Sequence, residues 1–139
     1  MQPAIAIVEF ISASSAGIVN VMLGFVPEFA ILIQNHGGTN PNIRLWANDS
    51  AFSGWAAALS LLLTGSTGVV TRDTTGISVF AGTNQITEAE SVNDDPKHVD
   101  NAGAEVTVVP FIAQAGLVIP ADHQTNSGRN LVIAFRRNR

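Results

Sequence analysis

The 139-residue sequence contains no cysteine. A disulfide framework and chemistry by a thiolate are therefore both excluded. The chain is long enough to bury one hydrophobic core, so it needs neither disulfides nor a metal to fold. We therefore expect a single domain over residues 1–139, of a kind suited to a reducing compartment.

Charged residues are scarce as well, at 13% of the chain, against about 25% in a typical globular protein. A small domain has much surface for its volume, so neutral or apolar surface must face either water or another subunit. We expect the second arrangement, and hence a homo-oligomer. The net charge of −4 argues against a nucleic-acid partner, because binding to phosphates needs a cationic surface.

Long hydrophobic runs are missing too. The most apolar stretch, Ala51 to Leu63, is interrupted by Ser53, Gly54 and Ser60 and falls short of the roughly 20 apolar residues that span a bilayer. The N-terminus has no basic region and carries Glu9 within its apolar part, which is not typical of a signal peptide. We therefore expect a water-soluble protein without a membrane partner.

Short apolar segments between turn signals make up most of the chain. In GFVPEFAILIQN, residues 24–35, Pro27 fixes its own φ and removes a backbone donor, so an extended segment is favoured over a helix. Similar patterns predict strands near 4–11, 17–23, 29–35, 42–47, 67–72, 76–82, 104–113 and 129–136. Only residues 51–63 favour a helix, of about three turns. About eight short strands predict an all-β domain, a β-sandwich or jelly roll.

The last predicted strand shows the clearest alternation. Its two faces carry Leu131, Ile133 and Phe135 on one side and Asn130, Val132, Ala134 and Arg136 on the other. This period of two is typical of a strand.

Residues suited to chemistry do not form a recognisable site in the sequence. His36, His98 and His123 lie in polar turn segments without a second ligand at metal-binding spacing, so we expect them to be solvated. Neither a nucleophile elbow nor a phosphate loop is present. We therefore predict no catalytic residue, no metal and no cofactor. Trp46 and Trp55 could stack on a sugar, but in a small sandwich such residues more often belong to the core or an interface.

Four segments together resemble a known family. They are GFVPEFAILIQN (24–35), Trp46, TTGISVFAGTN (74–84) and GLVIPADHQTNSGRNLVIAFRR (116–137). In this order they are similar to a pattern in small virion proteins of tailed bacteriophages, the capsid cement or decoration proteins. The resemblance implies a non-enzymatic, dimeric jelly-roll clamp on the outside of the phage head. Its partner would be the major capsid protein, and many copies would be bound to each virion.

Two segments are candidates for the partner interface. Ala51 to Leu63 holds more large apolar side chains than one short element usually buries, which favours Trp55, Leu59 and Leu62 as interface residues, with Trp55 as the anchor. The alternative is that the whole segment belongs to the core. The C-terminal Arg136, Arg137 and Arg139 suit carboxylates of the capsid protein or of residues 88–100 in a neighbouring copy. The alternative for this tail is a frayed, solvated end.

A second function class stays open beside capsid cementing. The same kind of β-sandwich could be a tail-fibre or baseplate module that binds a host surface glycan through Trp46 or Trp55 and the Asn-rich loop.

Overall fold

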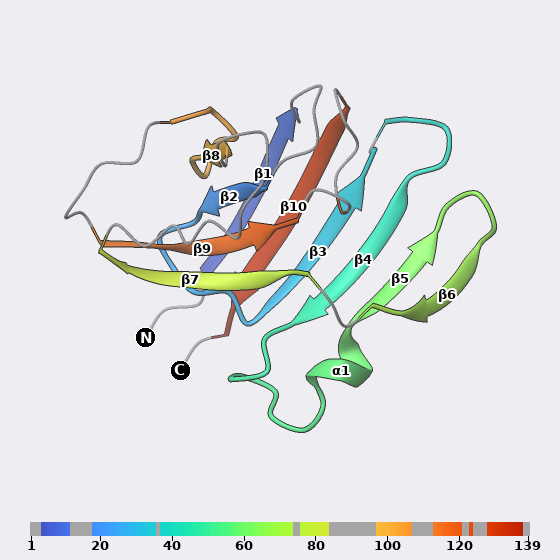
Figure 1. Cartoon of the computed structure of the whole chain (residues 1–139), viewed down its shortest axis with the longest axis horizontal. Coiled ribbons are helices and arrows are strands. Elements are labelled where there is room, and N and C mark those ends of the chain that lie inside the picture. The colour runs from blue at the N-terminus through green and yellow to red at the C-terminus, as the bar shows by residue number, and fades with distance from the viewer. Residues whose placement is uncertain are drawn as a thin grey trace.

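The computed structural model describes residues 4–11, 18–35, 37–73, 76–83, 97–106, 113–120, 123 and 128–137. Within these ranges the chain forms ten strands and one short helix (Figure 1). In chain order they are β1 (Ala4–Ile11), β2 (Val19–Met22), β3 (Phe29–Gln34), β4 (Asn42–Ala47), α1 (Ala56–Leu59), β5 (Leu61–Thr64), β6 (Val69–Arg72), β7 (Ser78–Thr83), β8 (Lys97–Val99), β9 (Ala113–Ile119) and β10 (Arg129–Arg136).

The strands form two sheets. The larger sheet has six antiparallel strands in the order β1-β10-β3-β4-β5-β6. The smaller has the order β7-β9-β2-β8, in which β2 and β8 are parallel. Figure 1 shows the smaller sheet crossing in front of β1, β10 and β3. The predicted all-β sandwich is thereby confirmed, whereas its jelly-roll connectivity stays a prediction.

One hydrophobic core lies between the two sheets. Because side chains alternate along a strand, every second residue of the larger sheet points toward the smaller one. Val8 and Phe10 of β1 and Leu32 of β3 share this core with Val21 of β2 and Leu117 of β9. All five are almost completely buried, so the contact between the sheets is the main hydrophobic contribution to stability.

The opposite face of the larger sheet, here called the outer sheet face, is apolar as well. The pairing register places on it Ile5, Ile7, Glu9, Ile11, Phe29, Ile31, Ile33, Ile43, Leu45, Ala47, Leu61, Leu63, Val70, Arg72, Arg129, Leu131, Ile133 and Phe135. Of these residues, Ala47 alone is buried, and the others are half-buried or exposed. The two predicted faces of the last strand therefore exist, with Val132 and Ala134 in the core and Leu131, Ile133 and Phe135 on the outer sheet face.

The smaller sheet differs in this respect. Phe80, Val118 and Asn20 lie on its face away from the core and are buried too. The apolar surface that the described strands leave accessible is therefore concentrated on the larger sheet.

The largest departure from the predicted elements is at residues 51–63. A short helix is present within this range, but it spans only Ala56–Leu59. Ser60 is extended, and Leu61–Thr64 forms β5 between β4 and β6. The prediction of one short helix near 51–63 is therefore confirmed, but the helix does not extend over three turns, because pairing of Leu61–Thr64 on both sides supplies backbone hydrogen bonds that a longer exposed helix would not improve.

The chain between 97 and 119 also differs from the prediction. Instead of a strand at 104–113, Glu105 forms an isolated bridge to Val99, residues 107–112 lie outside the described part, and β9 starts at Ala113. The three-residue strand β8 was not predicted. Elsewhere the predicted and observed strands agree closely, and those at 4–11, 42–47 and 129–136 agree in both bounds.

Candidate assembly site

The turn from Gly24 to Glu28 joins the two sheets and fixes the start of β3. Gly24 has a φ of +80°, a conformation that glycine adopts without strain. Pro27 and Glu28 are buried. The Glu28 N–H donates to the Phe135 carbonyl (2.9 Å), and the Glu28 carbonyl accepts from the Asn48 N–H (2.9 Å). The Gly-aromatic-x-Pro-acid turn thus connects the start of β3 with the end of β10 and with the segment that follows β4.

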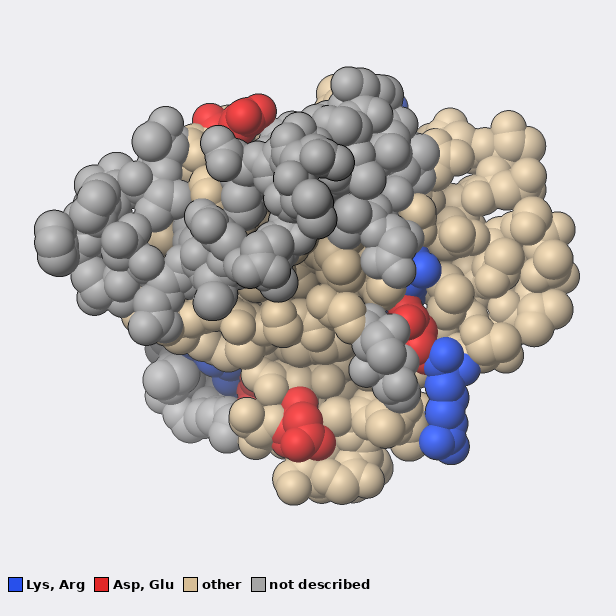
Figure 2. Space-filling view, viewed as in Figure 1, with Lys and Arg blue, Asp and Glu red and all other residues tan. Residues whose placement is uncertain are grey.

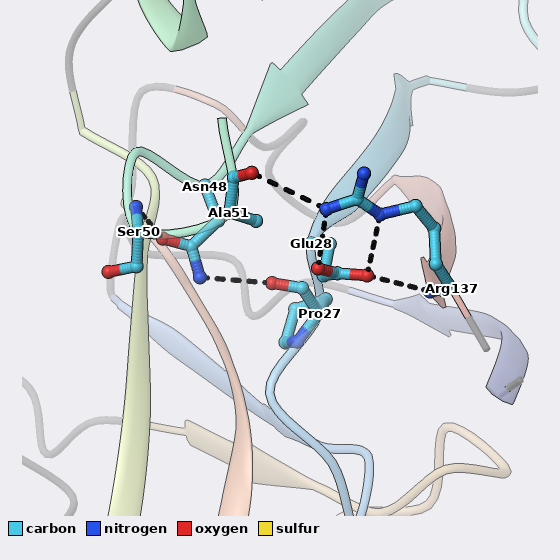
Figure 3. A network of polar contacts seen from close by, with 6 residues as sticks. All are labelled: Pro27, Glu28, Asn48, Ser50, Ala51 and Arg137. Atoms are coloured by element: carbon cyan, nitrogen blue, oxygen red, sulfur yellow. Dashed lines mark hydrogen bonds and ion pairs between the residues drawn. The ribbon is translucent and has the colours of Figure 1, made fainter. Parts of the chain in front are cut away.

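The Glu28 carboxylate is the centre of this junction (Figure 3). Its Oε1 accepts from the backbone N–H of Arg137 (2.7 Å) and from Arg137 Nε (3.2 Å), and its Oε2 accepts from Arg137 Nη2 (3.1 Å). The Glu28 side chain is only 6% exposed, whereas that of Arg137 is 54% exposed. A buried carboxylate held by a two-pronged guanidinium and a backbone donor is a strong, directional contact.

The same junction holds the segment that follows β4. Asn48 Nδ2 donates to the Pro27 carbonyl (3.2 Å), and Asn48 Oδ1 accepts from the Ser50 N–H (3.0 Å). Arg137 Nη2 lies 3.4 Å from the Ala51 carbonyl, and its guanidinium lies 4.8 Å from the centre of the Phe52 ring. This segment is therefore braced by the backbone carbonyls of Pro27 and Glu28, just before β3, and by the side chain of Arg137, just after β10 (Figure 3).

Trp55 stands at the end of the braced segment. Its N–H donates to the Phe52 carbonyl (2.9 Å), and its own carbonyl accepts from the N–H groups of Ala58 (2.9 Å) and Leu59 (3.1 Å) in α1. The Trp55 side chain is nevertheless exposed, with 63% of the residue accessible. An exposed indole on a fixed backbone suits a contact with another molecule.

The other two apolar residues predicted at the interface are less exposed than Trp55. Leu59 is half-buried in α1. Leu62 is half-buried in β5 and pairs with Arg44 on the inner side of the sheet. The alternative that all of 51–63 is core is wrong for Trp55, while the role of Leu59 and Leu62 in an interface stays a prediction.

Two of the three arginines of the basic tail have contacts within the chain. Arg136 is the last residue of β10, and its guanidinium lies 5.4 Å from the centre of the Phe25 ring. Arg137 pairs with Glu28 of its own chain. The frayed-end alternative is therefore wrong for these two residues. Arg139 lies outside the described residues, and docking of the tail onto a partner's carboxylates stays a prediction.

A second polar cluster lies on the inner side of β4, and no pattern in the sequence indicated it. Arg44 is buried and donates to Asp73 Oδ2 (2.6 Å) and to Gln34 Oε1 (2.6 Å). His123 Nε2 lies 3.4 Å from the same Asp73 oxygen. A buried charge is tolerated only when it has partners. Asp73 and Gln34 are those partners for the Arg44 guanidinium, which lies where the apolar core ends.

The expected solvation of the histidines is wrong for both that the structure describes. His123 is only 3% exposed, and His98, half-buried in β8, lies with Nδ1 3.2 Å from Asn20 Nδ2. His36 lies outside the described residues. The sequence pattern misled here because turn-like composition does not show which side of the backbone a loop side chain occupies.

A hollow of about 430 Å³ opens between the end of β4, α1 and the start of β7. Trp46, Asn48 and Asp49 line one side of it, and Ser60, Ile77 and Ser78 line another. It therefore combines one aromatic side chain with several groups able to form hydrogen bonds.

The described surface is otherwise poor in charge. Figure 2 shows few charged side chains among the residues described on the side that carries the smaller sheet. Among the described residues, no helix has the length and apolar character to cross a membrane, and no group of three or more His, Cys, Asp or Glu is placed to hold a metal ion.

A scan against protein-family models and searches of curated proteins and of solved structures found no match to this chain.

Proposed function

We propose that this chain is a non-enzymatic structural protein of a bacteriophage virion, located on the outside of the capsid, where it binds the major capsid protein and stabilises its lattice. The observation that carries the proposal is the exposed Trp55 on a segment braced by Glu28, Asn48 and Arg137. A rigid aromatic anchor loses little conformational entropy on binding. The order of motifs that resembles phage cement proteins supports the same assignment.

Stabilisation in this proposal works by mass action. A protein that binds only the assembled, expanded shell shifts the equilibrium toward that state. Many copies multiply a small free energy at each site. The mechanism therefore needs a well-placed contact surface and no chemical step.

The test compares phage heads that carry the wild-type protein, the Trp55→Ala variant or no copy of this protein. Trp55→Ala should retain its fold, because the side chain is exposed, and should weaken binding to heads by about tenfold or more, as loss of an anchor typically does. Heads without the protein should release DNA at a lower temperature. Val69→Ala is the matched control, because Val69 is 53% exposed and lies in β6, away from the braced segment.

Equal thermal release of DNA from heads with and without the protein would refute the cementing function. Equal binding by wild type and Trp55→Ala would instead refute the anchor and leave the cementing function to another surface.

The second candidate function is glycan binding on a tail fibre or baseplate. The hollow beside Trp46 and Asp49 is the observation that favours it. The number of copies per virion separates the two functions, because a cement protein approaches the capsid protein in copy number and a fibre module does not.

A further inference from the structure

The outer sheet face extends across all six strands without a charge in its central part. At its edges Ile5, Ile7 and Val70 are 72%, 64% and 58% exposed. In the middle of the face, Ile31 and Ile133 pair with each other and are half-buried. A face that only met water would normally carry polar side chains at these alternate positions.

The face is at the upper end of the apolar patches found on monomers, and its area approaches that of a protein interface. Six strands about 4.8 Å apart, with an average of roughly six residues at 3.3 Å each, cover about 29 by 20 Å, or roughly 580 Å² in projection. Side chains standing up from the sheet make the accessible area larger. The largest apolar patch on a typical monomer is about 300–600 Å², and a stable complex buries about 800 Å² on each partner.

Charge on the face is confined to its margin. Arg72 is the last residue of the edge strand β6. Glu9 and Arg129, at one end of β1 and β10, pair with each other at 2.9 Å. The centre of the face can therefore be buried without removing an unpaired charge from water, which is the usual obstacle to a buried interface.

We propose that the outer sheet face binds a second copy of this chain, so that two six-stranded sheets pack face to face. Regular sheet faces pack about 10 Å apart with interdigitating side chains, and a two-fold axis makes the same patch complementary to itself. This inference does not depend on the proposed function.

A second copy fits better than the capsid shell for a reason of timing. An apolar face of this area on a free chain would promote aggregation from the moment of folding. The shell is available only after assembly, whereas another copy is present as soon as the protein is made. The dimer would also leave Trp55 accessible, because Trp55 lies before α1 and outside the outer sheet face.

Two neighbouring valines in β6 allow a matched test. Val70 lies on the outer sheet face and Val69 on the opposite face, and they are similarly exposed at 58% and 53%. We compare Val70→Lys, Val69→Lys and the central variant Ile31→Lys with the wild type by sedimentation over a range of concentrations, and check each fold by circular dichroism. Because Val69 and Val70 are exposed, these two variants keep the test valid even if Ile31→Lys does not fold.

The wild type is expected to sediment with twice the mass of one chain. Val70→Lys should raise the dimer dissociation constant by roughly tenfold, and Ile31→Lys by about a hundredfold or more, because its ammonium would lie unpaired in the interface. Val69→Lys should behave as the wild type does. A wild type that is monomeric at all concentrations would overturn the proposal, and so would equal effects of Val69→Lys and Val70→Lys. A monomeric wild type whose binding to heads is lost in Ile31→Lys would assign the face to the shell.

Discussion

At the scale of single residues, Glu28 has the clearest energetic role. Its carboxylate is buried and accepts from both the backbone and the guanidinium of Arg137. Glu28→Gln removes the charge, and its amide nitrogen would have to face a donor. We expect a loss of about 1.5–3 kcal/mol in the free energy of unfolding, the usual range for a hydrogen bond to a charged group. Urea unfolding measures the change.

Arg137→Ala is the matched control for this prediction. The Arg137 side chain is 54% exposed, its backbone N–H to Glu28 is retained in the variant, and water can reach the carboxylate where the guanidinium lay, so the loss should be smaller than for Glu28→Gln. Equal losses for Glu28→Gln and Arg137→Ala would show that the ion pair, and not the buried carboxylate as a whole, stabilises the junction.

The Glu28–Arg137 contact also shows what a sequence pattern cannot supply at this scale. The two residues are 109 positions apart, and periodicity relates only neighbours along the chain. Pro27 and Glu28 were recognisable as a turn, but their partners became apparent only when β3 and β10 were paired. In the same way, the sequence indicated Trp55 as a candidate anchor. It did not indicate that contacts of Asn48 and Arg137 hold the segment before Trp55 in place.

At the scale of elements, strands with strict alternation were predictable and strands defined by their neighbours were not. β1, β4 and β10 agree with the predicted bounds because alternating or β-branched residues end at clear turn signals. β5 has the sequence Leu-Leu-Leu-Thr, which carries no alternation and favours a helix locally. Its position between β4 and β6 decided its conformation, so tertiary pairing overrode local propensity.

Substitution of Gly116 tests how closely β9 packs against β2. A Cβ at Gly116 in β9 would come within 2 Å of the Val21 carbonyl oxygen of the neighbouring β2. Gly116→Ala must therefore displace backbone, and we expect a loss of about 1–3 kcal/mol or more in the free energy of unfolding. Thermal or urea unfolding measures this loss.

Gly54 provides the contrast. It has a φ of +84°, and a Cβ at this position would meet no atom of the described residues within 4 Å, so only its backbone conformation restricts it. Gly54→Asn should cost little, because asparagine tolerates the left-handed region, whereas Gly116→Asn should be at least as harmful as Gly116→Ala. Similar losses at both positions would show that β9 and β2 can separate without cost.

At the scale of the whole molecule, the composition predicted that apolar surface would remain accessible. It did not predict which strands would carry that surface. Along β10 both sets of alternate residues include apolar side chains, so periodicity alone did not decide which set faces the core. Packing of the smaller sheet onto one side decides it: Val132 and Ala134 become core, and Leu131, Ile133 and Phe135 become the outer sheet face. The prediction placed the interface around residues 51–63, whereas the widest apolar surface lies on strands from both ends of the chain.

Packing of two outer sheet faces has a consequence for thermal unfolding. If each dimer unfolds to two separate chains, a tenfold rise in protein concentration stabilises the dimer by about 1.4 kcal/mol. For a chain of 139 residues, the typical entropy of unfolding converts this into a rise in Tm of about 2 °C per tenfold. Calorimetry of the wild type over two decades of concentration measures the slope. Ile31→Lys should melt at a Tm that does not change with concentration, and Val69→Lys should keep the wild-type slope. A flat Tm for the wild type above micromolar concentration would mean that the larger sheet unfolds without a partner on its outer face.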